Sequence, residues 1–478
     1  MTKSLEEVCS DVLEKTVPTN NERKHILELA EKLRRRVKTA VEEARIEAEV
    51  RVEGSVAKDT WLKEEPDIDI FLQVPITMPR TAFGTICLEI AKKATEGHKQ
   101  VERFAEHPYL ESFIDTTRVN IVPCYRVKKG EWISAADRTP FHTDYLKPLL
   151  NKSLRREIRL LKRFMKGIGV YGAEIRVGGF SGYLCELIIL HYGSFAKSLR
   201  SIADWRESRI IDHEDHFEGR DQEVRRIFDE PLVVVDPVDR GRNAAAAVRK
   251  EKLDELIVAS RAFLAKPRLE FFYPQETVTY ALDKLFHVMT ARGSTIVFIR
   301  FGRVRAPPDV LWGQLYKSLR SLRKMLQQHD FKIIRDQVWS DERDLNMFVF
   351  EVEQRSLPFT KKHLGPPVEK MEECENFLRK HVGMASTIAG PYVEGGRWVV
   401  ETKRRHTDVV KLLAEKLKRG GRGVGVADLI SKALTDTIGI LVNGEIAKLY
   451  SSNAEFAKFL TEYLKGKPRW LNGIAVQK

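Results

Sequence analysis

The stretch that decides the fold is residues 52–72, which read VEGSVAKDTWLKEEPDIDIFL. Gly54 and Ser55 follow a short run, 48–52, in which apolar and charged residues alternate as in a β-strand. A strand that ends at Gly-Ser and turns into a helix leaves unpaired backbone N–H groups at the helix start, and these groups attract phosphate. The Ser55 hydroxyl adds one more donor, so this half of the stretch predicts a phosphate-binding turn.

The second half of the stretch places two carboxylates on one face of a strand. Side chains alternate between the faces of a strand, so Asp67 and Asp69 share one face while Ile68 and Ile70 take the other. Two carboxylates this close repel each other unless a cation binds them, and Mg²⁺ prefers carboxylates and substrate phosphates. When it occurs alone, a Gly-Ser pair is usually only a turn, and an Asp-x-Asp motif is usually a solvated strand edge or a loop. Together, with the second inside the apolar run 68–74, they favour a catalytic site.

The composition predicts a globular protein of several domains with a polyanionic partner. A chain of 478 residues is too long for a single core, and 43% of its residues are hydrophobic. Its net charge of +13 points to a partner such as nucleic acid, although a protein can also be basic without such a partner. The five cysteines are scattered without C-x-x-C spacing, which predicts a reducing, cytoplasmic location. The sequence contains no apolar run long enough to span a membrane, so no membrane partner is expected.

Further along the chain, residues 119–125 read VNIVPCY and predict a strand that Pro123 ends or forces to an edge of a sheet. Residues 151–167 predict an amphipathic helix with its cations on one face, and a solvated surface is the plain interpretation of those cations. From about residue 269 the pattern changes to α+β. The strands expected there are 270–273, 295–300, 332–334, 347–352 and 438–442, with helices at 311–327 and 453–465.

Several motifs, in order, resemble those of one enzyme family. Gly-Ser followed by an Asp-x-Asp strand resembles nucleotidyltransferases of the polymerase-β type, and the full set resembles the archaeal (class I) CCA-adding enzymes, which are tRNA nucleotidyltransferases. The motifs are GSVAKDTWL (54–62), DID (67–69), VPCY (122–125), DRTPFH (137–142), RLLK (159–162), YGAE (171–174), GFSGYLCE (179–186) and VDPVD (235–239), followed by Arg242 and Asn243. The resemblance in motifs covers about residues 50 to 250, and the rest resembles the family in organisation.

The resemblance implies a metal site and a nucleotide site. Two Mg²⁺ ions would be bound by Asp67, Asp69 and the residue at position 120. The residues that would hold the triphosphate and ribose are Gly54, Ser55, Lys58, Thr139, His142, Lys162 and Tyr171. Arg242 would help to read the base together with the tRNA. Outside these motifs, His142 and Tyr171 would be taken as structural residues, and Arg242 as one half of a salt bridge to Asp236 or Asp239.

The resemblance also implies an α+β multidomain architecture. A polymerase-β-type nucleotidyltransferase head would occupy residues 1–146 and a helical neck residues 147–265. An α+β body of the ferredoxin- or RRM-like type would comprise 266–366 and 435–478, with an inserted, tRNA-gripping tail at 367–434 that contains the basic residues 403–405. The implied activity is template-independent addition of C, C and A to the 3′ end of tRNA from CTP and ATP. The alternatives are a poly(A)-type 3′-nucleotidyltransferase and a non-catalytic tRNA-binding relative, and homodimerisation stays open.

The chain departs from the family pattern at its metal ligands. The family more often has Arg where this chain has Lys58, Glu where it has Asp67, and a third carboxylate where it has Asn120. An amide oxygen brings no charge, whereas magnesium sites rely on anionic ligands. Asp115 lies five residues away and on the opposite face by parity, so it does not replace the missing carboxylate. The sequence therefore predicts a slow or inactive form, and an engineered and a natural origin of Asn120 are both compatible with it.

Overall fold

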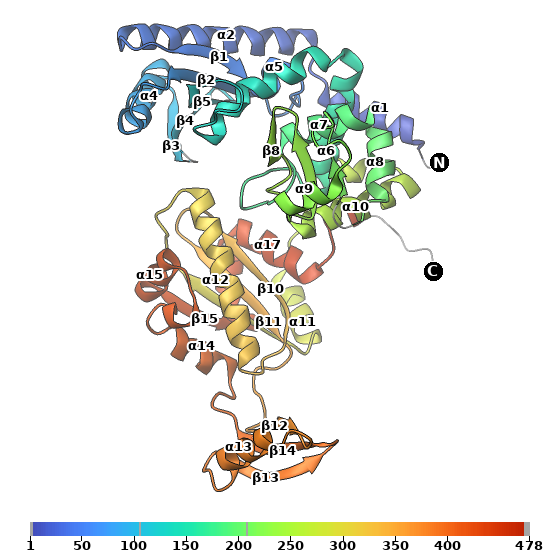
Figure 1. The fold of residues 1–478 in the computed structure, drawn as a ribbon, viewed down its shortest axis with the longest axis vertical. Helices are drawn as coiled ribbons and strands as arrows, with labels where there is room; N and C mark the ends of the chain where they lie inside the picture. Colours follow the sequence, from blue (N-terminus) through green and yellow to red (C-terminus); the bar gives the residue numbers. More distant parts are fainter. Residues whose placement is uncertain (1–2, 105–106, 207–208, 473–478) are drawn as a thin grey trace. The chain divides into compact units, whose positions relative to one another are not determined.

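The computed structural model describes residues 3–104, 107–206 and 209–472, and the chain forms two compact units (Figure 1). The first unit comprises the chain up to Glu276 together with the segment that starts at Lys467. The second unit runs from Thr277 to Gly466. All five cysteines are free and buried. Within the described residues, no helix has both the length and the hydropathy needed to cross a membrane.

A five-stranded sheet in the first unit carries the residues of the stretch 52–72. Its strand order is β1-β2-β5-β4-β3, and only the β2–β5 pair is parallel. The strands are β1 (Glu49–Glu53), β2 (Asp67–Pro75), β3 (Lys99–Phe104), β4 (Pro108–Ile114) and β5 (Thr117–Arg126). Ile68 and Ile70 face a core formed with α2 (Asn20–Glu43) and α4 (Arg80–Ala94). The alternation predicted for β2 is confirmed, and it leaves Asp67 and Asp69 on the other face of the sheet.

Strand β5 differs from its prediction because Pro123 neither ends it nor moves it to the edge. β5 continues to Arg126 and is the central strand of the five. In the described sheet, β4 pairs with β5 only as far as Leu110 opposite Ile121, two residues before the proline. Proline is tolerated where one side of a strand makes no ladder hydrogen bonds. Pro123 therefore lies where β5 still pairs with β2 but is no longer paired with β4.

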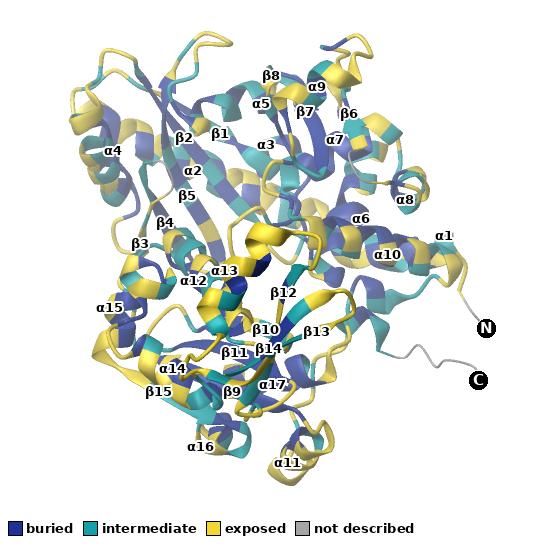
Figure 2. Ribbon diagram, turned by 60° about the horizontal axis from the view of Figure 1, so that its bottom comes forward, coloured by how far each residue is buried: buried dark blue, intermediate teal, exposed yellow. Residues whose placement is uncertain are grey.

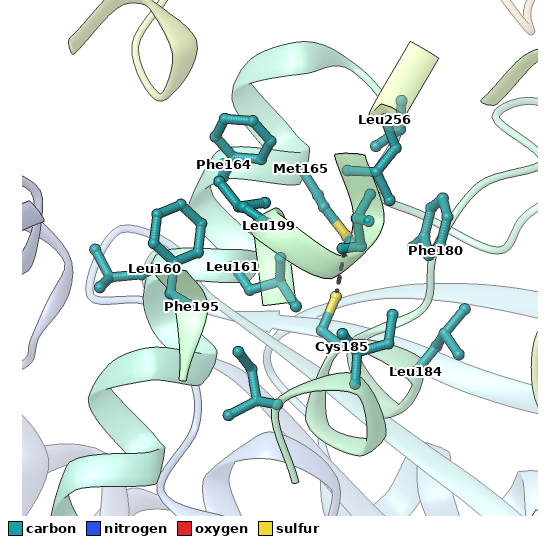
Figure 3. Close-up of a cluster of buried hydrophobic side chains, with 14 of the residues drawn as sticks. Leu160, Leu161, Phe164, Met165, Phe180, Leu184, Cys185, Phe195, Leu199 and Leu256 are labelled. Atoms are coloured by element: carbon teal, nitrogen blue, oxygen red, sulfur yellow. Dashed lines mark hydrogen bonds between the residues drawn. The ribbon is translucent and has the colours of Figure 1, made fainter. Parts of the chain in front are cut away.

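The remainder of the first unit is mainly helical and has one large aromatic core. Its helices include α1 (Leu5–Thr16), α5 (Thr139–Leu149), α6 (Lys152–Ile168), α7 (Gly182–Tyr192), α8 (Phe195–Ala203), α9 (Asp221–Ile227) and α10 (Lys250–Ala265). A small sheet accompanies them, with the order β6 (Arg209–Ile211), β7 (Leu232–Asp236) and β8 (Asp239–Asn243). Figure 3 shows how α6 contributes Phe164 and Met165 to this core, where the Cys185 thiol donates to the Met165 sulfur at 3.4 Å.

The strand predicted at 270–273 is wrong. Residues Leu269–Phe271 form a short 3-10 helix, and the neighbouring rings of Phe271 and Phe272 are both fully buried. A strand would direct two successive side chains to opposite faces, whereas both rings here pack against Phe164 in the same core. The apolar residues at 270–273 are therefore explained by burial in a helical core and not by a strand.

The second unit is built on a four-stranded antiparallel sheet with helices on both faces. Its order is β10 (Ile333–Ser340), β11 (Asn346–Val352), β9 (Thr295–Phe301) and β15 (Ile438–Val442). One face packs on α12 (Pro308–Gln328), α14 (Val409–Leu417) and α15 (Asp428–Asp436). The other face packs on α11 (Leu282–Ala291), α16 (Ala447–Ser452) and α17 (Ala454–Lys465). Most of α11 is exposed, as Figure 2 shows, while its residues Leu285 and Met289 are buried. The predicted α+β alternation is thus confirmed.

A smaller three-stranded sheet lies within the segment between β11 and β15. It has the order β12 (Thr360–Pro367), β14 (Arg397–Lys403) and β13 (Thr387–Glu394), and α13 (Met371–His381) accompanies it (Figure 1). The helices α14 and α15 share a core with α12 and β9 rather than with these strands. The domain boundaries inferred from the sequence stay predictions.

Candidate active site

Two carboxylates and an amide lie next to one another on the open face of the five-stranded sheet. Asp67 and Asp69 project from β2, and Asn120 lies opposite Asp69 on the parallel strand β5. The Asn120 amide nitrogen donates to Asp69 Oδ1 at 2.9 Å. Both oxygens of Asp67 accept from the guanidinium of Arg118, with the Nε contact at 3.0 Å. Asp67, Asp69 and Asn120 are the three side chains that were predicted to hold Mg²⁺.

The cross-strand register extends this row of polar residues in both directions. Glu53 pairs with Asp69 on one side, and Glu111 pairs with Asn120 on the other. Paired residues on neighbouring strands share a face of the sheet. Burial raises the pKa of Asp69 to about 6, and the charge of Asp67 adds to this effect although the hydrogen bond from Asn120 opposes it. Burial likewise raises the pKa of Glu53 to about 7. Carboxylates in such surroundings favour either a proton or a bound cation.

The chemistry of this donor set fits Mg²⁺, because Asp67, Asp69 and Asn120 all offer side-chain oxygens. Among the described residues, no group of three or more His, Cys, Asp and Glu side chains stands ready to hold a metal ion. At this face, the residue opposite Asp69 on β5 is the amide Asn120. The site therefore combines two carboxylates with one neutral oxygen donor.

Gly54 brings the predicted phosphate turn against Asp69, one of the predicted metal ligands. Its φ of +71° is a conformation that other L-residues rarely adopt, and a Cβ at this position would lie 2.2 Å from Asp69 Oδ2. The turn continues as the five-residue helix α3 (Gly54–Lys58), in which Ser55 is half-buried. Both the backbone conformation and the space therefore require glycine before Ser55.

A buried cluster of two lysines and one glutamate follows α3. Lys58 Nζ donates to Glu186 Oε2 at 2.5 Å, and Lys162 Nζ donates to Glu186 Oε1 at 3.0 Å. The Thr60 hydroxyl donates to the same carboxylate and accepts from Lys162 at 3.1 Å. Burial alone would raise the pKa of Glu186, but Lys162 and Lys58 outweigh it and hold that pKa at about 2. Two ammonium groups on one carboxylate leave one net positive charge beside the turn.

Tyr171 lies at the same cluster. A Cβ built on Gly182, the first residue of α7, would lie 2.9 Å from the Tyr171 hydroxyl and 3.5 Å from Lys162 Nζ. The hydroxyl and the ammonium group are therefore neighbours at the start of α7. The sequence predicted both residues for nucleotide binding, and the structure brings them together with Lys58.

A second cluster is organised around the buried carboxylate of Asp236. It lies 2.9 Å from His142 Nε2, and it accepts from the Tyr183 hydroxyl at 3.0 Å and from Arg242 at 2.6 Å. The His142 and Tyr183 rings stack with centroids 4.0 Å apart. Lys58 Nζ lies 5.7 Å from the centre of the Tyr183 ring, so Tyr183 connects the two clusters. Burial lowers the pKa of His142 despite the contact with Asp236.

This cluster contains the salt bridge that was the plain alternative for Arg242. The guanidinium is half-exposed, whereas the carboxylate of Asp236 is fully buried. Thr139, also predicted for nucleotide binding, is the first residue of α5 and is half-buried. His142 lies one turn further along the same helix.

Sequence reasoning assigned no role to Glu186, Tyr183 or Glu111, and it treated Asp236 only as a partner of Arg242. One signal was available for Glu186, because it is the only charged residue in the buried apolar run 184–189. A buried carboxylate in such a run requires partners. The identity of those partners, Lys58 and Lys162, depends on contacts between residues far apart in the chain.

Comparisons with known proteins match nearly the whole chain. Three family models match in order: "Nucleotidyltransferase domain" at residues 30–142, "tRNA nucleotidyltransferase, second domain" at 156–273 and "CCA-adding enzyme, C-terminal domain" at 292–439. The CCA-adding enzyme of Methanothermobacter thermautotrophicus is 39% identical over 87% of this chain and 90% of its own length. The CCA-adding enzyme of Pyrobaculum aerophilum is 39% identical over 90% of this chain and 98% of its own length.

Proposed function

Because this chain belongs to the archaeal CCA-adding enzymes, a family of tRNA nucleotidyltransferases, we propose a role for each cluster of its active site. The chain adds C, C and A to the 3′ end of tRNA, and its substrates are tRNA and nucleoside triphosphates. The observation that carries this conclusion is the ordered match of three family models together with 39% identity over most of the chain.

Mg²⁺ is the proposed cofactor, and Asp67, Asp69 and Asn120 are its proposed ligands. The support is their arrangement, since three side chains that carry oxygen donors lie together on one face of β2 and β5. When bound, the metal supplies positive charge at the triphosphate and at the attacking 3′ hydroxyl. Release of Arg118 from Asp67 would free that carboxylate for the ion, and Arg118 is 46% exposed and has space to move.

The proposed triphosphate site is formed by Gly54, Ser55, Lys58 and Lys162. Its support is the net positive charge of the Lys58–Glu186–Lys162 cluster beside the turn at Gly54. Charge-assisted hydrogen bonds from ammonium groups are the strong contacts available to phosphate. Thr139 and Tyr171 would complete the site at the ribose and phosphates, and Lys58 offers a point charge where an arginine would offer a fork.

Arg242 is proposed to lie beside the base, and His142 beside the ribose and phosphates. Template-free addition requires protein groups, the tRNA backbone or both to read the nucleotide. Arg242 presents paired donors to an acceptor edge that cytosine and adenine share and that uracil and guanine arrange differently. This proposal is supported by the contacts of Arg242 and His142, because both side chains bind the carboxylate of Asp236 and are held in place by it.

The charge missing at position 120 is proposed to make this chain slower than a version with aspartate there. The amide oxygen of Asn120 coordinates without neutralising charge, and it does not help to activate the attacking hydroxyl. An engineered and a natural origin of Asn120 are both compatible with this proposal.

The tail, residues 367–434, is proposed to bind the tRNA. The proposed location of the protein is the cytoplasm. Free thiols at all five cysteines agree with a reducing compartment. Homodimerisation stays a prediction, for which light scattering at several protein concentrations is the direct measurement.

The function is tested with labelled nucleotides on tRNA that lacks its terminal CCA. With CTP and ATP together we expect three additions, ending in A, and with CTP alone we expect two. Long runs of A without incorporation of C would instead identify a poly(A)-type enzyme. Salt-dependent tRNA binding without any incorporation would identify a non-catalytic relative.

A further inference from the structure

Glu111 is a nearly buried carboxylate on the active-site face that the proposed mechanism leaves without a role. It lies on β4 directly opposite Asn120, on the side of β5 away from β2. Cross-strand partners share a face, so Glu111, Asn120 and Asp69 form one row across three strands. Glu111 is 5% exposed, and a carboxylate this buried requires cationic partners, of which Arg103 is one.

The spacing of this row suits a cation shared between its two ends. Neighbouring strands are about 4.8 Å apart, so the backbones at Asp69 and Glu111 are about 10 Å apart. Carboxylate oxygens on opposite sides of a bound Mg²⁺ are about 4 Å apart, which leaves about 3 Å for each side chain to cover. Aspartate and glutamate side chains both reach that far.

A cationic side chain already connects the two carboxylate positions. The guanidinium of Arg118 binds Asp67 through both oxygens and lies 3.9 Å from Glu111 Oε2. Asp67 and Glu111 are therefore close enough to contact one cation of guanidinium size across the strand that carries Asn120. Arg103 donates to Glu111 Oε1 at 2.8 Å, which leaves Oε2 for a second partner.

We propose that Glu111 is a metal ligand in this chain and supplies the third carboxylate that Asn120 lacks. The proposal rests on the proposed metal site at Asp67 and Asp69. In the described side-chain arrangement no three acidic groups are preassembled for a metal. Metal binding therefore exchanges the contact between Arg118 and the carboxylates for a contact with the ion, while Arg103 continues to hold Glu111.

The test is the affinity of the full-length chain for Mn²⁺, measured without substrate by electron paramagnetic resonance of the free ion. Glu111→Gln keeps the size of the side chain and an acceptor for Arg103. In the chain with Asn120 we expect this variant to weaken Mn²⁺ binding about tenfold or more. With Asn120→Asp present, a carboxylate stands in the family's place, and the same Glu111→Gln change is expected to weaken binding less than about threefold.

Glu102→Gln is the matched control. Glu102 pairs with Leu110 on the same sheet, so it projects from the opposite face, and its side chain is 57% exposed. Removing this charge should leave Mn²⁺ affinity unchanged. Thermal unfolding of each variant without metal shows whether it folds, and Glu111→Asp serves as a second variant that keeps the charge and should retain more affinity than Glu111→Gln.

Asp69→Ala distinguishes a failure of the proposed metal site from a failure of the proposed role of Glu111. If it leaves Mn²⁺ binding unchanged, the metal site itself is misplaced. If it removes Mn²⁺ binding while Glu111→Gln has no effect in the chain with Asn120, the site stands and the role of Glu111 is overturned. Equal losses from Glu111→Gln with Asn120 and with Asn120→Asp would also overturn it, because they would show that Glu111 does not replace a missing carboxylate.

Discussion

The side-chain amide of Asn120 donates a hydrogen bond of 2.9 Å to Asp69 across the parallel strands β5 and β2. At that distance an aspartate would place a second negative charge against Asp69, and the two would require a cation between them. The amide satisfies Asp69 without a metal. At the proposed Mg²⁺ site, Asn120 would therefore stabilise the metal-free form and weaken the attraction for the ion.

The first prediction follows from this relationship. Asn120→Asp should speed CMP incorporation at saturating Mg²⁺ by about tenfold or more, which corresponds to about 1.4 kcal/mol of activation free energy. It should also lower the Mg²⁺ concentration at half-maximal rate and reduce the free energy of unfolding in the presence of a chelator. The measurement is CMP incorporation beside the unchanged chain across a magnesium titration. Equal rates would show that position 120 is not a metal-ligand position.

The second prediction separates chemistry from affinity. Asp69→Ala should reduce transfer by roughly 10³-fold, because the metal supplies several kcal/mol of charge stabilisation. Its tRNA dissociation constant should stay within about twofold, since phosphate contacts by basic residues dominate affinity. Filter binding over a salt series measures this constant.

The comparison for the second prediction is a change in the tail. Arg404 is unsuitable because it donates to the backbone carbonyls of Pro358 and Thr360 at 3.0 and 2.6 Å. Lys403 and Arg405 are exposed, so Lys403→Ala/Arg405→Ala is the better variant. It should weaken tRNA binding and flatten the logarithmic salt slope by about 0.9 for each lost phosphate contact. Similar binding losses in both variants would contradict this division of roles.

Sequence patterns predicted the elements whose periodicity persists over many residues. The alternation at 67–71 identified β2 and the face that carries both aspartates, and the helical spacing at 151–167 identified α6. The pattern failed at 270–273, where tertiary packing buries two successive phenylalanines in a 3-10 turn. It was also wrong at Pro123, because strand pairing changes along β5 in a way that no local pattern records.

The active site shows the same limit. The residue types of the turn and of the Asp-x-Asp strand indicated their chemistry locally, whereas the partners of Lys58 and Asn120 come from distant segments. Glu186 is 128 residues from Lys58, and their contact exists only because the fold brings the side chain of Glu186 on α7 to that of Lys58 on α3. The role inferred for Glu111 depends on the strand order β2-β5-β4, which the sequence does not display.

The third prediction concerns nucleotide choice. Arg242→Ala should reduce the use of both CTP and ATP, or increase incorporation of UTP, because one set of paired donors is lost beside the base. The kinetics are measured with each of the four nucleoside triphosphates. Arg240→Ala is the control, since Arg240 lies on the same strand, is 59% exposed and contacts Glu223. Unchanged kinetics for Arg242→Ala would leave the salt bridge to Asp236 as its whole role.

The last prediction concerns stability and pH. Glu186→Gln leaves the buried ammonium groups of Lys58 and Lys162 without their counterion, so it should cost about 3–5 kcal/mol of unfolding free energy at pH 7. The folded-state pKa of Glu186 is held at about 2, below its ordinary 4.5. Its ionised form therefore contributes fully above pH 4.5, and the contribution is lost as pH falls toward 2.

Urea unfolding at pH 7, 5 and 3 checks this prediction. The difference between the chain and Glu186→Gln should be similar at pH 7 and 5 and smaller at pH 3. Glu65→Gln is the control, because Glu65 is 57% exposed and its salt bridge with Lys166 should contribute less than about 1 kcal/mol at any of these pH values. A difference for Glu186→Gln that is equally large at pH 3 would mean that its cost comes from packing. In that case the charge of Glu186 would not be what holds the two lysines beside the phosphate turn.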